Sequence, residues 1–98
     1  MGERTHVLKA DPIPFSDVAS GLKRCEVRQD DRGYQAGDRL HLREHDRAAG
    51  AYSGRECIAK VTHIQRGYGL PDGLVVLSID VLASNVAPAV GAAQGEGV

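Results

Sequence analysis

The sequence predicts an α+β, mostly-β domain: a small barrel of about five strands with a short N-terminal helix closing one end. Segments of alternating apolar and polar residues, typical of half-buried strands, recur along the chain, whereas one segment has helical spacing. Strands and helices do not alternate regularly, which disfavours a doubly wound parallel sheet. The 98 residues, 42% of them hydrophobic, suffice for one domain with a modest core.

The first predicted strand spans residues 5–9, where His6 and Leu8 share one face. A short helix follows, because Asp11 offers an N-cap ahead of Pro12. Gly21 is placed to end this helix, since glycine readily adopts the left-handed conformation. The helix has one apolar stripe, formed by Phe15, Val18 and Leu22.

Alternation predicts four more strands, over residues 25–28, 38–45, 55–64 and 74–82. It places Glu44 on the apolar side of its strand and directs Val75, Leu77, Ile79 and Val81 to the core. Polar loops are expected over residues 30–37 and 46–54, with a Pro-Asp-Gly turn before the last strand. Residues 1–82 are predicted to form the domain, and the Ala- and Gly-rich residues 83–98 a disordered tail.

Composition excludes several classes of protein. A net charge of -1 argues against bulk electrostatic attraction to polyanions. The chain has no apolar run of membrane-spanning length and no signal-peptide layout, so we expect a cytoplasmic protein, assumed monomeric, that does not bind membranes. Cys25 and Cys57 are expected to be buried free thiols. His41 and His45 share a face, but no further ligand completes a metal site, and we expect no metal or cofactor.

One stretch, residues 21–38, carries far more charge than packing requires, with the two signs balanced. Paired charges of this kind indicate a positioned site more than a patch for a polyanion. The alternative is a solvated strand face whose charges pair with a neighbouring strand. Lys23 lies opposite Glu26 and Arg28 by strict alternation, so all three meet only if Lys23 sits in a turn before the strand.

Within this stretch, the run Gly21, Lys23, Glu26 and Arg28 has the spacing G-x-K-x-x-E-x-R. It resembles the signature of ASCH domains, which are relatives of the PUA-like RNA-binding barrels. A longer pattern resembles the DUF3850 branch of bacteria and phages. That pattern includes H-x-L-K from His6, E-x-R-x-x-D-R-x-Y-x-x-G-D, Y-S-G-R and G-L-x-x-G-x-V-V-L-S-I, and covers Thr5 to about Val81.

The resemblance implies a PUA-like barrel with a cleft between helix and sheet, lined by this motif, that binds RNA or a modified nucleoside. Some ASCH members are hydrolases of N4-acetylcytidine or RNA. In the amidohydrolase branch a catalytic threonine follows the motif lysine by three residues, and here Glu26 takes that position. If the chain is an enzyme, Lys23 and Glu26 are therefore the candidate catalytic residues.

The candidate ligand-binding residues are those whose chemistry suits phosphate or a base. Arginine binds phosphate bidentately, a glutamate accepts from the exocyclic amine of cytosine, and tyrosine stacks on bases. Tyr34 and Tyr52 could instead cover a barrel mouth, Arg32 could clamp a loop, and His6 could be a satisfied core residue. The full set is His6, Lys9, Lys23, Glu26, Arg28, Arg32, Tyr34, Tyr52 and Arg55.

Three functions follow from these observations. The first is a module that binds single-stranded RNA or a nucleoside, and the second is a small ASCH-type hydrolase. The third is a phage or mobile-element accessory domain that binds another protein.

Overall fold

The computed structural model describes residues 3–85. Five strands and one helix make up this region. In chain order they are β1 (Thr5–Ala10), α1 (Pro12–Ala19), β2 (Cys25–Gln29), β3 (Arg39–Asp46), β4 (Ala51–Gln65) and β5 (Leu74–Asn85).

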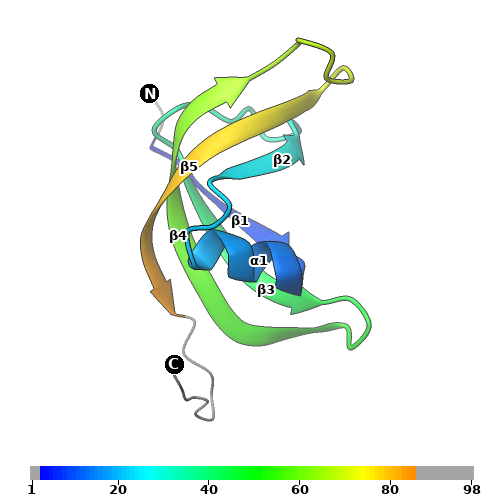
Figure 1. The fold of residues 1–98 in the computed structure, drawn as a ribbon, viewed down its shortest axis with the longest axis vertical. Coiled ribbons are helices and arrows are strands. Elements are labelled where there is room, and N and C mark those ends of the chain that lie inside the picture. Colours follow the sequence, from blue (N-terminus) through cyan, green and yellow to red (C-terminus); the bar gives the residue numbers. More distant parts are fainter. Residues whose placement is uncertain (1–2, 86–98) are drawn as a thin grey trace.

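The strands form one sheet in the order β1-β3-β4-β5-β2. β1 pairs with β3 in parallel, and the other three pairings are antiparallel. The sheet curls into a half-barrel around α1, which packs against β3 and β5 (Figure 1). The predicted mostly-β fold of about five strands and a short N-terminal helix is therefore confirmed.

Strand alternation decides what the half-barrel encloses. Leu8 of β1, Leu40 and Leu42 of β3, and Val61 of β4 face inward and are buried. Phe15 of α1 is completely buried among them. Apolar burial of this kind supplies most of the stabilisation, at about 25 cal/mol per Å². The prediction that Glu44 lies on the apolar face of its strand is also confirmed, because this side chain is buried.

Strand irregularities let β4 bend around the helix. The register between β4 and β5 shifts between Ile58 and Ala59 and again between Val61 and His63. A β-bulge bends a strand and increases its twist. The 15 residues of β4 therefore follow the curvature of the half-barrel along their whole length.

Several details depart from the predictions. The helix ends at Ala19, so Leu22 lies outside it and is 82% exposed rather than part of the apolar stripe. Part of the expected loop over residues 46–54 is strand, since β4 begins at Ala51. Val81 is exposed where β5 passes beyond the core.

The end of the domain and one cysteine also differ. β5 continues to Asn85, so residues 83–85 are paired with β4, and the rest of the predicted tail lies outside the described residues. Cys57 is buried as expected, but Cys25 is only half-buried. Both thiols are free.

Two arginines, one in β2 and one in the loop after it, link the β2 edge of the sheet to β1. Arg28 of β2 donates a 2.9 Å hydrogen bond from Nη2 to the backbone oxygen of Lys9 in β1. Arg32 donates from Nη1 to the backbone oxygen of Val7, at 3.2 Å. Unpaired edge carbonyls need partners, and here side chains take the place of a strand ladder. We call the line between β1 and β2 the seam.

No helix within residues 3–85 has the length and apolar character needed to cross a membrane.

Candidate ligand-binding pocket

A pocket of about 530 Å³ lies where the seam meets α1. Its walls come from the end of β1, the start of α1, the turn before β2, β2 itself and the end of β3. Its charged and titratable lining residues are Lys9, Asp11, Lys23, Glu26, Arg28, His45 and Arg47.

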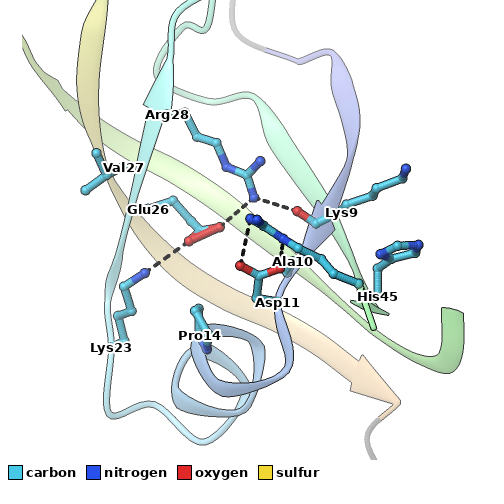
Figure 2. A pocket seen from close by; sticks show the side chains of 10 residues that line it. Lys9, Ala10, Asp11, Pro14, Lys23, Glu26, Val27, Arg28 and His45 are labelled. Carbon is cyan, nitrogen blue, oxygen red and sulfur yellow. Dashed lines mark hydrogen bonds and ion pairs between the residues drawn. The ribbon is translucent and has the colours of Figure 1, made fainter. Parts of the chain in front are cut away.

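Glu26 lies at the centre of the pocket wall and is only 4% exposed. Lys23 Nζ lies 3.2 Å from Glu26 Oε1, and Arg28 Nη2 lies 3.1 Å from Oε2. Figure 2 shows the two cations reaching this carboxylate from opposite sides. Each carboxylate oxygen therefore has its own cationic partner, which is the arrangement that a buried charge requires.

The chain places Lys23 by a tight turn after α1. Gly21 has φ of 86° and donates from its backbone N–H to the Val18 oxygen, while the Lys23 N–H donates to the Asp17 oxygen. Lys23 thus precedes β2, which begins at Cys25. The expectation that Lys23 must sit in a turn to meet Glu26 and Arg28 is confirmed.

Positive charge dominates the pocket. Among the described residues, four cations and two carboxylates line it, giving a formal charge of +2 with His45 neutral. Within residues 3–85, Arg28 hydrogen-bonds through Nη2 and Lys23 through one donor, so the N–H groups of Arg28 Nη1 and Nε and part of the Lys23 ammonium remain for a ligand. A ligand with an anionic or carbonyl oxygen suits this wall.

An exposed ion pair borders the mouth. Arg47 donates from Nε and Nη2 to the two oxygens of Asp11, at 3.0 and 3.1 Å. Arg47 lies in the β3–β4 turn and Asp11 directly before α1, so this pair ties the hairpin to the helix. The arginine side chain is 82% exposed, and an ion pair this exposed contributes little to stability.

The sequence from β1 into β5 matches a known family. Residues 5–79 match the family described as Domain of unknown function (DUF3850), and this range contains every pocket-lining residue. The chain belongs to the DUF3850 family. The chain is also similar to a phage protein described as an uncharacterized 12.9 kDa protein in the GpA 3′ region of Escherichia phage P2. The two are 36% identical over 64 residues, which cover 65% of this chain and 57% of the phage protein.

Five of the candidate residues lie away from this DUF3850 pocket. His6 and Tyr34 are buried together, with ring centroids 4.8 Å apart, and His6 Nε2 lies 2.8 Å from Asp38 Oδ2. Burial by itself would raise the pKa of Asp38, but hydrogen bonds from His6 and the backbone of Gln35 and Arg4 hold it below its usual value. These residues form a buried polar group inside the half-barrel.

Arg55 also lies away from the pocket and binds Glu44. It donates from Nε and Nη2 to the two oxygens of Glu44, at 2.8 and 2.7 Å. The hydrogen bond from Arg55 is the main cause that lowers the pKa of Glu44. Arg55 therefore neutralises a buried carboxylate of the core.

Arg32 and Tyr52 lie near the pocket without lining it. Arg32 lines a second depression, of about 390 Å³, that also includes Arg28 and Tyr34 and follows the seam. Tyr52 is 42% exposed, with the Arg43 guanidinium 4.0 Å from its ring centroid and His45 against its edge. Of the nine candidates, the pocket of this DUF3850 domain gathers Lys9, Lys23, Glu26 and Arg28.

Sequence reasoning missed the residues that complete the rim: Asp11, His45 and Arg47. The sequence predicts only a helix-capping role for Asp11, although its side chain makes no capping hydrogen bond. Arg47 follows the predicted strand over residues 38–45, and no motif around it indicates a site. Only the folding of the β3–β4 turn toward α1 brings it to the pocket, and no local pattern signals that contact.

Residues 3–85 contain no group of three or more His, Cys, Asp or Glu side chains arranged to hold a metal ion.

Proposed function

We propose that this protein is a cytoplasmic PUA-like module of the ASCH type that binds single-stranded RNA or a modified nucleoside in the pocket around Glu26. One observation carries the proposal. A carboxylate that is 4% exposed is held between two cations in the wall of an open pocket.

The chemistry of the wall suits a nucleotide. Arg28 and Lys23 offer donors to phosphate or carbonyl oxygens. Glu26 can accept from an exocyclic amine or a ring N–H of a base when one of its cationic partners turns to the ligand. The same wall thus provides both kinds of contact that a nucleotide needs.

A purely structural role explains this cluster less well. Replacing buried ion pairs by apolar residues is often neutral or stabilising, so core packing does not call for them. The three charges also lie beside a pocket rather than within the core cluster. The motif that resembles ASCH domains supports the same conclusion.

Affinity measurements on pocket variants test the proposal. Lys23→Ala and Arg28→Ala should each weaken binding of a twelve-nucleotide single-stranded RNA and of cytidine monophosphate at fixed salt, by about tenfold or more. Arg66→Ala removes an equal charge from a loop ion pair outside the pocket and should bind like wild type. Unchanged affinity in both pocket variants would refute the proposal.

Glu26→Gln separates binding from folding. This variant keeps the size of the side chain but removes its charge, so it should change ligand affinity while circular dichroism and the unfolding transition show a folded domain. If Glu26→Gln and wild type bind every nucleotide with equal affinity, the carboxylate has no role in recognition.

The contact between Lys23 and Glu26 favours a second candidate, a hydrolase that cleaves N4-acetylcytidine or RNA. A lysine 3.2 Å from a carboxylate offers a nucleophilic or electrostatic group beside an acid-base group. Turnover of N4-acetylcytidine or labelled RNA that Glu26→Gln abolishes would establish it. Absence of such turnover in the wild-type protein would leave the binding function alone.

A further inference from the structure

We propose that the outer surface of β1, β3 and β4 is a second binding surface, which holds the phosphate backbone of a single-stranded nucleic acid beyond the pocket. The inference rests on the proposed function, because the strand it binds is the continuation of the nucleotide in the pocket. We name this surface the outer basic face and define it by Lys9, Arg39, Arg43 and Lys60.

The register of the sheet brings these four cations together. Arg39 is the cross-strand neighbour of Lys60, and Lys9 is the neighbour of Arg43. All four occupy positions opposite to the buried ones, such as Leu8 and Leu42, and so project from the convex side. Strands β1, β3 and β4 are neighbours in the sheet (Figure 1). The register of these strands therefore brings the four cations into one patch.

These cations are not neutralised. Among the described residues, Lys9, Arg39 and Lys60 have no side-chain ion pair, and Arg43 contacts the ring of Tyr52. Asp80 is the cross-strand neighbour of Lys60, yet no ion pair joins them. The arginines at the seam and inside the half-barrel are, in contrast, bound to carboxylates or carbonyls.

Carboxylates are distributed differently. Glu26, Asp38 and Glu44 are buried, each beside a cationic partner or histidine. Two carboxylates share the face with the cations: Glu56, which is the cross-strand neighbour of Arg43 and hydrogen-bonds His41, and Asp80 beside Lys60. Four cations against two carboxylates leave an excess of positive charge on this face of a chain whose net charge is -1, an asymmetry typical of proteins that contact phosphates.

The outer basic face is continuous with the pocket. Lys9 belongs to both, and His45 lines the pocket while its ring contacts the edge of Tyr52. Tyr52 in turn lies under Arg43, with its exposed part available to stack on a base. Stacking and phosphate contacts side by side favour a nucleic acid strand over a lipid surface as the occupant.

The test compares a long and a short ligand. Arg39→Gln with Lys60→Gln should weaken binding of a twelve-nucleotide single-stranded RNA about tenfold near physiological salt. The slope of the logarithm of the binding constant against the logarithm of the salt concentration should become shallower by about 1.4, that is about 0.7 for each lost phosphate contact. Cytidine monophosphate should bind this double variant as tightly as wild type, since it reaches only the pocket. Both residues are exposed strand positions, so the fold should remain.

Two controls isolate the charge and its position. Arg39→Lys with Lys60→Arg keeps both charges and should keep the affinity for the long RNA. Arg66→Gln removes a charge elsewhere and should have little effect. An unchanged affinity in the charge-removing double variant, or an equal loss in Arg66→Gln, overturns the proposal.

The same titrations separate this inference from the proposed function. If Lys23→Ala leaves all affinities unchanged while the double variant loses the long RNA, the pocket function fails and the outer basic face stands. If Lys23→Ala weakens binding of both ligands while the double variant binds the long RNA like wild type, the pocket function stands and the outer basic face fails. A third outcome is that the wild-type protein binds phosphatidylserine vesicles but no RNA, and that the double variant no longer binds the vesicles. This result assigns the face to lipid and also overturns the inference.

Discussion

Glu44 and Arg55, eleven positions apart, form a two-point ion pair at the edge of the core, with oxygens and nitrogens 2.7 and 2.8 Å apart. The glutamate side chain is 6% exposed and the arginine 34%. The guanidinium also lies 5.8 Å from the ring centroid of Phe15. Arg55 of β4 therefore pairs with Glu44 of β3 and lies against Phe15 of α1.

Removing Arg55 should destabilise the fold. Arg55→Ala leaves the Glu44 carboxylate buried without its partner, and we expect the free energy of unfolding to fall by about 2–3 kcal/mol, less than for a fully buried pair because Arg55 is partly exposed. Urea unfolding at neutral pH measures this. Arg47→Ala removes the same two-point geometry from an exposed pair and should cost less than about 1 kcal/mol. Equal losses in the two variants would contradict this explanation.

Stability should decrease in acid. The pKa of Asp38 and of Glu44 lies below the ordinary values of 3.8 and 4.5, so each carboxyl binds a proton less readily in the folded than in the unfolded chain. Their stabilising contribution is complete above about pH 5 and is lost as the pH falls through the folded pKa. Asp38→Asn should flatten the acid limb of the unfolding free energy against pH. An unaltered limb would show that Asp38 does not contribute to it.

The two thiols should react at different rates. Burial, assisted by the charge of Glu26, raises the pKa of Cys57 to about 11, and its side chain is inaccessible. The half-buried Cys25 should therefore react with a thiol reagent in the native protein, and Cys57 only after unfolding. Counting modified thiols by mass spectrometry tests this. Simultaneous modification of both in the folded state would disagree with the structure.

Gly21 should resist substitution. Its φ of 86° strains any residue with a β-carbon, even though the space around it is open. Gly21→Ala should lower the unfolding free energy by roughly 1 kcal/mol and weaken binding in the pocket, because the same turn aims Lys23. Gly21→Asn should lose less, since asparagine tolerates this conformation better. Ser20→Ala, at ordinary backbone angles, serves as the comparison.

Local alternation was enough to predict most of the fold. The buried faces of β1, β3 and β4 follow from the period of two, including the inward Glu44, because that pattern directly reflects burial. In β2 the pattern misleads: the apolar Val27 is 50% exposed and the charged Glu26 is buried, where Lys23 and Arg28 hold it. The ends of the strands were harder to predict than their buried faces. Tertiary pairing with β3 extends β4 into a stretch rich in Ala, Gly and Ser, which has no strand pattern of its own.

Predicting the candidate site required more than spacing. The proximity of Lys23, Glu26 and Arg28 in the sequence made their meeting predictable once a turn was assumed. Tyr34 could not be placed from its polar loop, because its burial depends on His6, a residue 28 positions earlier that reaches it only through the curl of the sheet. Contacts between distant segments of this kind leave no local signal.

The bridge made by Arg28 links two properties of the molecule. Its Nη2 group donates both to Glu26 in the pocket and to the Lys9 carbonyl on the edge of β1. A compound that recruits Nη1 and Nε leaves this bridge in place and should slow amide hydrogen exchange along β1 and β2. One that draws Nη2 away should speed exchange there, so the sign of that change reports which arginine nitrogens a compound uses.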